Sequence, residues 1–176
     1  MKTNVAGSRV EISIATSLGK FTARYSEKGL MELDFPKAGR ASSRAAKQND
    51  IPVQIRRWHR TTTAALQSAL AGREPKDFPP LDPAGTEFQQ RVWNALRKIP
   101  AGQTKSYGKI ARAIGKAKAV RAVGGACGAN PIPVLVPCHR VLAANGKIGG
   151  FSGGLDWKRE LLAREGVVLQ PQGGDR

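Results

Sequence analysis

A cysteine followed directly by a histidine carries the clearest chemistry in this chain of 176 residues. Both lie in the segment Pro137–Val141. Cys138 is one of two cysteines in the chain, and His139 is one of two histidines. The apolar run at 132–136, punctuated by prolines, predicts a buried strand before them, and a glycine cluster at 149–154 follows. A cysteine between such a strand and such a turn can be held in one position and still be reached from outside.

Four roles are open to this cysteine. A buried structural thiol is the usual fate of a free cysteine. A disulfide to Cys127 needs an oxidising compartment, but Met1–Leu18 lacks the long apolar core of a signal peptide, so we expect a reducing, cytoplasmic location. A zinc site is disfavoured because there is no C-x-x-C spacing and the histidines lie far apart; it would need Cys127, Cys138, His139 and His59.

The fourth role is a catalytic nucleophile, and the local sequence favours it. Arg140 is permanently charged and His139 can share a proton, so both are expected to favour the thiolate, which is the reactive form of cysteine. On a regular strand, however, Cys138 and His139 would point to opposite faces. Either the segment leaves strand geometry there, or a water lies between the two side chains.

The charge of the chain predicts a polyanionic partner. The formal net charge is +16 and the sequence pI is about 10.7. No apolar run is long enough to span a bilayer, and the basic residues are spread along the chain rather than gathered on one amphipathic helix. We therefore expect the partner to be nucleic acid and not a membrane. The alternative is that the charge reflects only a generally basic surface.

The first half of the chain predicts a small antiparallel sheet and one helix. Apolar alternation and turn glycines indicate three strands in Arg9–Pro36, and an apolar stripe indicates a helix over Ile51–Ala71. The polar segment Gly39–Asp50 between them is expected to be a mobile loop. Four prolines in Pro75–Pro83 indicate an extended linker. We place a domain boundary there, with an α/β support domain at 1–80 and a second domain at 81–176, whose tail, 167–176, is expected to be disordered.

The second half predicts mostly helices. A capping box at Thr86 and Gln89 opens a helix that Pro100 ends. Ser106 is the expected N-cap of a short helix, and a second helix is expected over Ala117–Ala129, which gives a helix-turn-helix.

The second helix of this pair has an unusual outward face. Its apolar face comprises Val120, Val123 and Cys127, so Cys127 is expected to be a buried thiol. The other face is nearly free of bulk apart from two basic residues, and comprises Lys118, Arg121, Ala122, Gly125 and Ala129. The minor groove is about 6 Å wide and a helix with side chains about 10–12 Å, so a stripped helix suits that groove and reads little sequence. Close helix–helix packing is the alternative, but Arg121 in the middle of the face favours DNA.

Several ordered motifs resemble the O6-alkylguanine-DNA alkyltransferases. The similarity runs from about Gly85 to Gly166 and includes Asn130–Val141, Phe88–Trp93, Ser106-Tyr107, Arg121–Gly125 and Phe151–Leu155. It implies an α+β fold with a ribonuclease H-like N-terminal domain, made of a small antiparallel sheet with a helix, and a mainly helical C-terminal domain with the helix-turn-helix. Some relatives carry zinc in the N-terminal region, but no cysteine precedes Cys127 here, so we predict no metal and no cofactor.

The resemblance also implies roles for single residues. Arg121 would enter the base stack in place of a flipped nucleotide, and Tyr107 would help to rotate that nucleotide and donate to a guanine ring nitrogen. Asn130 would be a hinge to the active-site loop. Glu165 would orient His139, which would take the thiol proton through a water.

The expected substrate pocket comprises Asn130, Pro133, Val141, Phe151 and Ser152. The backbone N–H of Ser152 would serve O6, and the carbonyls of Cys138 and Val141 would hold the exocyclic amine. Many relatives have tyrosine where this chain has Phe151, so any contribution from a hydroxyl is lost there.

The resemblance implies a DNA repair protein that flips O6-alkylguanine from duplex DNA and moves the alkyl group to Cys138. The thioether product resists water, so the protein is consumed once per lesion. We expect a monomer that can bind double-stranded DNA cooperatively. Two rivals stand beside this hypothesis: a helix-turn-helix module that binds the lesion without removing it, and a cysteine hydrolase that uses Cys138, His139 and Glu165 on acyl substrates.

Overall fold

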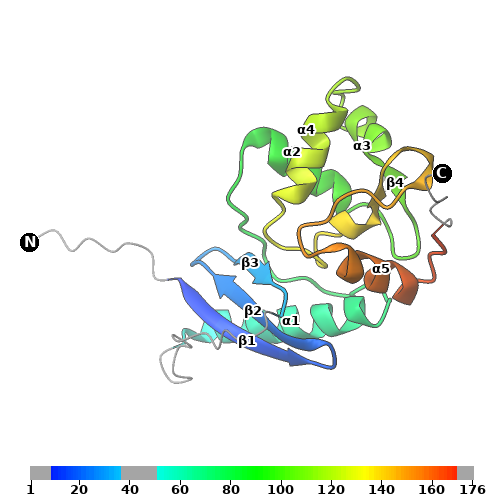
Figure 1. Cartoon of the computed structure of the whole chain (residues 1–176). Coiled ribbons are helices and arrows are strands. Elements are labelled where there is room, and N and C mark those ends of the chain that lie inside the picture. Colours follow the sequence, from blue (N-terminus) through cyan, green and yellow to red (C-terminus); the bar gives the residue numbers. More distant parts are fainter. Residues whose placement is uncertain (1–8, 37–50, 170–176) are drawn as a thin grey trace, which may run out of the picture.

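The computed structural model describes residues 9–36 and 51–169 and opens with a three-stranded antiparallel sheet (Figure 1). Its strands are β1 (Val10–Thr16), β2 (Gly19–Tyr25) and β3 (Leu30–Asp34), in that order across the sheet. Alternate residues of β2 form its core face, since Phe21, Ala23 and Tyr25 are 0% exposed. The predicted sheet is confirmed, whereas the expected loop 39–50 and residues 170–176 of the tail lie outside the described ranges.

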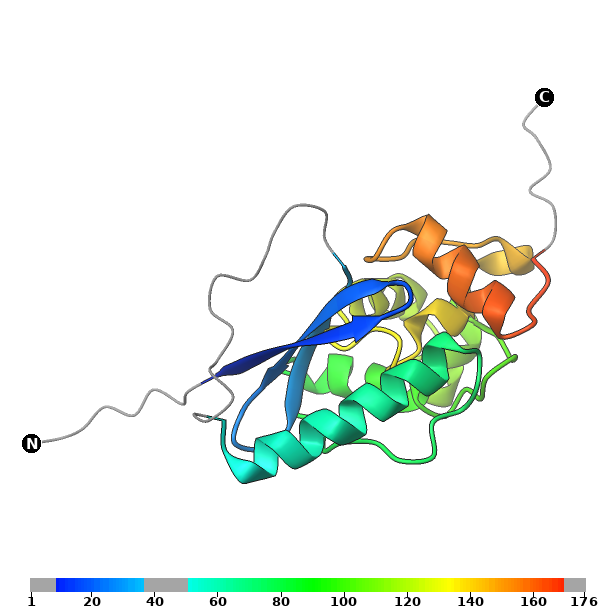
Figure 2. The ribbon, with the colours of Figure 1, turned by 90° about the horizontal axis from the view of Figure 1, so that it is seen from below.

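The predicted N-terminal helix is also present, as α1 (Val53–Leu70), and lies beside the sheet (Figure 2). The predicted stripe is buried at Ile55, Thr62, Leu66 and Leu70. The helix is followed by Gly72 in the left-handed region, where the backbone touches the end of the last helix of the chain: a Cβ here would lie 2.0 Å from the Arg164 carbonyl oxygen.

The proline-rich segment 75–83 is extended, as predicted, but it is bound to the sheet rather than free. The Leu30 N–H donates to the Pro80 carbonyl and the Asp82 N–H donates to the Leu30 carbonyl, each at 2.8 Å. The division at residue 80 and the likeness to ribonuclease H stay predictions. No helix within the described residues is long and apolar enough to cross a membrane.

Between residues 81 and 169 the second half comprises four α-helices and two very short strands. In chain order these are α2 (Glu87–Leu96), β4 (Lys105–Ser106), α3 (Tyr107–Ala113), α4 (Val120–Gly128), β5 (Val141–Leu142) and α5 (Leu155–Arg164). The capping box of Thr86 and Gln89 and the N-cap at Ser106 are both confirmed. Figure 1 shows α2, α3 and α4 together at the end of the molecule away from α1.

Helix α4 begins later than predicted. Residues 116–119 form a turn, closed by the Ala119 N–H donating to the Lys116 carbonyl at 2.8 Å, so the helix starts at Val120. Val120 is 41% exposed, and its assignment to the buried face was wrong, while Val123 and Cys127 are buried as predicted. The indole Nε1 of Trp93 in α2 donates to the Ala126 carbonyl at 2.8 Å and so fixes α4 against α2.

Candidate active site

The segment before Cys138 is buried, as predicted, but it is not a strand. Residues 132–136 form turns, and Val134 adopts a positive φ of 73°, which is rare for a β-branched residue. Pro131, Pro133 and Pro137 lack the N–H groups that a strand ladder needs, which explains the failure of the strand prediction. Cys138 then opens a short 3-10 helix that ends at Arg140, so the segment leaves strand geometry at the cysteine.

Asn130 holds this loop together. Its side-chain Nδ2 donates to the Val136 carbonyl at 2.8 Å and lies 3.1 Å from the Cys138 Sγ, and its Oδ1 accepts from the Ile132 N–H at 3.0 Å. Asn130 is 6% exposed, so these contacts are shielded from water. Asn130, two residues after the end of α4, therefore fixes both the loop and the sulfur atom.

A two-stranded parallel pairing links the helix-turn-helix to the loop. Lys105 and Ser106 of β4 lie beside Val141 and Leu142 of β5. Tyr107 directly follows β4, and the Cys138–Arg140 turn directly precedes β5, so the pairing brings the tyrosine to the cysteine. Strands of two residues leave no periodic pattern, and sequence reasoning missed this link.

A cavity of about 490 Å³ opens onto Cys138. Helices α3 and α4 form one side of it and the glycine-rich segment after β5 forms the other; it is lined by Tyr107, Val120, Arg121, Gly124, Cys127, Gly128, Cys138, Gly150, Phe151 and Ser152. Cys138 is only 4% exposed, so the sulfur lies at the floor. The residues of the predicted bare face are all exposed, namely Lys118, Arg121, Ala122, Gly125 and Ala129, and of these Arg121 lines the cavity.

Neither the disulfide nor the zinc alternative matches the geometry. Cys127 and Cys138 are both free thiols. Within residues 9–36 and 51–169, no three side chains of the types that hold metal ions gather. His59 lies instead in α1, with its Nδ1 3.1 Å from the hydroxyl of Tyr25.

Behind the cysteine, His139, Arg140 and Glu165 form a buried ionic cluster. The His139 Nε2 lies 2.8 Å from the Glu165 Oε1, and the Arg140 Nη2 donates to the same oxygen at 2.9 Å. The side chains of His139 and Glu165 are each 1% exposed. His139 Nδ1 has no hydrogen-bond partner within the described part of the chain.

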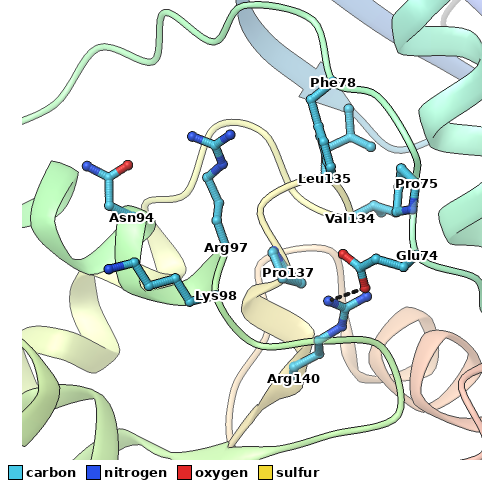
Figure 3. Close-up of a pocket in the computed structure, with 10 residues that line it drawn as sticks. All are labelled: Glu74, Pro75, Phe78, Asn94, Arg97, Lys98, Val134, Leu135, Pro137 and Arg140. Carbon is cyan, nitrogen blue, oxygen red and sulfur yellow. Dashed lines mark hydrogen bonds and ion pairs between the residues drawn. The ribbon is translucent and has the colours of Figure 1, made fainter.

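Arg140 does not act on the sulfur as the sequence suggested. Its guanidinium pairs with Glu165 and donates to the Ile99 carbonyl, behind the loop. It also reaches Glu74 at 3.5 Å across a second hollow of about 500 Å³ (Figure 3). Pro137 lines this hollow while Cys138 lines the other cavity, so the loop separates the two.

The cation that does act on Cys138 is Lys158 of α5, which sequence reasoning missed. Lys158 is 0% exposed, and its Nζ donates to the Val141 carbonyl at 2.7 Å and to the Gly150 carbonyl at 3.2 Å. Burial lowers the pKa of Lys158 to about 8, against the attraction of Cys138 and Cys127. A lysine in an amphipathic helix gives no sequence signal of burial.

The protonation states follow from burial and from these contacts. Burial raises the pKa of Cys138 to about 11, although the Asn130 amide and the Lys158 charge act in the opposite direction. Burial lowers the pKa of His139, against its bond to Glu165. Burial alone would raise the pKa of Glu165, but the bonds from His139 and Arg140 outweigh it and lower that pKa to about 2. At neutral pH the site holds a thiol, a neutral imidazole and a carboxylate.

The expected pocket residues fall into two groups. Phe151 and Ser152 line the cavity beside Cys138, and Asn130 lies beneath its sulfur. Val141 is 0% exposed and does not line the cavity, and its carbonyl accepts from the Lys158 Nζ at 2.7 Å. Pro133 does not line the cavity but faces a neighbouring hollow of about 420 Å³.

Known proteins share this arrangement over most of the chain. The family model described as "6-O-methylguanine DNA methyltransferase, DNA binding domain" matches residues 87–167. A methylated-DNA–protein-cysteine methyltransferase of Methanosarcina acetivorans is 44% identical over 153 residues, which cover 85% of this chain and 93% of that protein. A protein of the same name from Mycolicibacterium paratuberculosis is 60% identical over 85 residues, or 48% of this chain and 52% of that protein.

Solved structures agree with the sequence comparisons. The crystal structure of Mycobacterium tuberculosis OGT in complex with DNA superposes with a TM-score of 0.71 at 38% identity, over 87% of this chain and 90% of that chain. A crystal structure of Mycobacterium tuberculosis O6-methylguanine methyltransferase gives 0.68 at 37% identity, over 90% of this chain and 93% of that one. With 44% identity to a relative that it covers almost completely, and with Cys138 at the floor of the cavity beside α4, this chain belongs to the methylated-DNA–protein-cysteine methyltransferase family.

Proposed function

We propose that this protein repairs O6-alkylguanine in DNA by transferring the alkyl group to the sulfur of Cys138. The observation that carries the proposal is the position of that sulfur, at the floor of a cavity whose lining includes Arg121 of the exposed, nearly bare face of α4. Relatives with the printed names above and the DNA complex of one of them support the same reaction and partner.

The thiol needs a base before it can react. With a pKa of about 11, roughly one Cys138 in ten thousand is ionised at pH 7. His139 is neutral and accepts protons, and its Nδ1 has no partner within the described residues, so we assign it the thiol proton, passed through a water. Glu165 holds the opposite nitrogen and stabilises the imidazolium that results.

The alkyl carbon is saturated, so transfer is a displacement at carbon. The Sγ–C bond forms as the C–O6 bond breaks, and the electron pair leaves with guanine. Tyr107 and Ser152 both line the cavity, and we assign to the Tyr107 hydroxyl the donation to the guanine ring nitrogen and to the Ser152 backbone N–H the donation to O6 as negative charge develops. The thioether that forms is not cleaved by water at a useful rate, so each molecule acts once.

The base must leave the duplex to reach a buried sulfur. Arg121 lies on both the exposed face of α4 and the cavity lining, which suits it to fill the gap left by the flipped nucleotide. The lack of bulk at Ala122, Gly125 and Ala129 suits close approach of the helix to the minor groove, with little readout of sequence. We further propose that the protein binds DNA as a monomer and can bind cooperatively.

Mass spectrometry after mixing with a duplex that carries O6-methylguanine tests the reaction. We expect a stoichiometric gain of one methylene on the wild type and on Cys127→Ala, which serves as the matched control because Cys127 lines the same cavity. Cys138→Ala should gain nothing. Binding without any mass change would support a lesion-binding module, and repeated turnover of an ester would support a hydrolase; either outcome would overturn the proposal.

A further inference from the structure

The wall of the cavity that faces the alkyl group has little stiffness of its own. Gly150, Phe151 and Ser152 line the cavity, within a segment whose four glycines are Gly149, Gly150, Gly153 and Gly154. Two hydrogen bonds restrain this segment. The Gly154 N–H donates to the Phe151 carbonyl at 3.1 Å, and the Lys158 Nζ donates to the Gly150 carbonyl. Glycines leave the backbone many conformations, so packing must fix the position of Phe151.

This wall is also thin. Ser152 lines both the 490 Å³ cavity of Cys138 and the neighbouring hollow of about 420 Å³. That hollow lies between the wall and the end of β3, and Phe35 and Trp157 are among the residues that line it. A displaced wall would therefore meet open space and not packed protein.

Phe35, which directly follows β3, is the side chain that supports the wall. Its ring centroid lies 5.8 Å from that of Phe151, at an interplanar angle of 70°. A Cβ added at Gly153 would lie 2.5 Å from the Phe35 ring, so that ring meets the wall at two positions, Phe151 and Gly153. Phe35 reaches from the N-terminal sheet to the residue that lines the alkyl side of the cavity.

Phe35 is itself held by two other aromatic rings. Its centroid lies 4.8 Å from that of Trp157 in α5 and 5.6 Å from that of Phe21 in β2. Phe21 is 0% exposed and meets Trp157 edge-on at 5.7 Å. Tilted and edge-on ring contacts of this kind favour one arrangement over others, so the cluster transmits the position of the sheet to Phe151.

We propose that Phe35 is a positioning residue that sets which alkyl groups Cys138 accepts. This inference rests on the proposed alkyl transfer. A methyl group touches little of the wall, whereas a benzyl group must pack against Phe151, so loss of Phe35 penalises benzyl transfer selectively. The N-terminal sheet thus determines substrate range through the contact between Phe35 and Phe151.

Rates of transfer from free O6-benzylguanine and from an O6-methylguanine duplex test the proposal. In Phe35→Ala we expect the concentration of O6-benzylguanine that gives the half-maximal rate to rise at least about tenfold, because the loss of one apolar packing partner typically has an effect of that size. The methyl rate should stay within about twofold. Phe35→Leu, which keeps an apolar side chain but loses the ring, should change the benzyl rate in the same direction by a smaller factor, and it replaces Phe35→Ala should that variant fail to fold.

Val10→Ala is the matched control, because Val10 is buried in the same sheet but pairs with Tyr25 rather than with Phe21. It should lower the melting temperature without changing the ratio of benzyl to methyl rates. An unchanged ratio in a folded Phe35 variant, or an equal change in the Val10 control, overturns the inference. Absence of methyl transfer in the wild type would instead overturn the proposed function, so the two failures are distinguishable.

Discussion

Glu165 receives His139 and Arg140 on one carboxylate oxygen, at 2.8 Å from the His139 Nε2 and 2.9 Å from the Arg140 Nη2. The imidazole is therefore oriented by an anion whose own position is fixed by a buried guanidinium. The arrangement couples the active site to stability, because neither charge can lose its partner without leaving the other buried.

Glu165→Gln is expected to destabilise the protein and slow transfer together. The neutral amide leaves Arg140 without its buried counter-charge, a loss typically of about 3–5 kcal/mol in the free energy of unfolding. Urea denaturation measures this change. The matched control is Glu160→Gln in α5, the helix that Glu165 directly follows. The exposed pair of Glu160 with Arg164 is of the kind typically worth at most about 1 kcal/mol.

The buried contacts of Glu165 with His139 and Arg140 also predict how the stability of the protein depends on pH. The pKa of Glu165 is about 2 in the folded protein, against an ordinary value of 4.5, so its stabilisation is complete above pH 4.5 and is lost as the pH falls toward 2. Urea midpoints measured from pH 6 downward should fall more steeply in the wild type than in Glu165→Gln. Parallel curves would show that the carboxylate is not the linked group.

Local sequence patterns predicted most helices and strands of this fold. Where a pattern fitted two conformations equally, contacts between residues far apart in the sequence decided between them. The alternation in Val10–Thr16 and the capping box at Thr86 depend on neighbours in sequence, and both are confirmed. The apolar run at 132–136 fits a strand or buried turns equally, and the prolines and the Asn130 side chain decide for turns.

The wrong sequence-based predictions at the active site also arise from contacts between residues that are far apart in the sequence. Arg140 stands two residues from Cys138 in sequence, yet its guanidinium turns to Glu165, 25 residues further along the chain. Lys158 lies 20 residues beyond Cys138 and acts on it because the Val141 and Gly150 carbonyls draw its ammonium inside. Proximity in sequence was a poor guide to which cation favours the thiolate.

Lys158→Met is expected to slow transfer about tenfold at pH 7. Loss of the ammonium raises the pKa of Cys138 further, and one unit corresponds to a tenfold change in the thiolate fraction. In the wild type, the rise of rate with pH should bend near pH 8, where Lys158 loses its charge. The variant should lack that bend.

Single-turnover rates from pH 6 to 10 provide this measurement, with Arg159→Met as the control, since Arg159 is an exposed cation adjacent to Lys158 on α5. Equal rates for Lys158→Met and the wild type, with both folded, would exclude an electrostatic role for Lys158.

Gly125→Leu should separate DNA binding from chemistry. Nothing lies within 4 Å of a Cβ at this position, so the fold accepts the side chain, and leucine favours a helix over glycine by about 0.8–1 kcal/mol. The bulk projects from the exposed face of α4, so duplex affinity should fall at least tenfold while transfer from a free base is kept. Fluorescence anisotropy with a labelled duplex measures the affinity.

Ala64→Leu provides the comparison for that bulk, because Ala64 is exposed on α1, at the end of the molecule away from α4. This variant should bind DNA like the wild type. If both substitutions weaken binding equally, the bare face of α4 is not the surface that meets DNA.

Arg121→Ala tests whether the exposed arginine on the cavity edge helps to extrude the base. Arg121 lies on the outward face of α4 and lines the cavity, and we propose that its side chain occupies the stack once a nucleotide has left it. A free base needs no extrusion. We therefore expect transfer from duplex O6-methylguanine to slow by about 10–100-fold, on the scale of the few kcal/mol that unstacking costs, and transfer from free O6-benzylguanine to stay within twofold.

Arg112→Ala is the control for loss of charge alone, because Arg112 is an exposed cation on α3. Equal slowing of both substrates by Arg121→Ala would place the arginine in the transfer step and remove it from base extrusion.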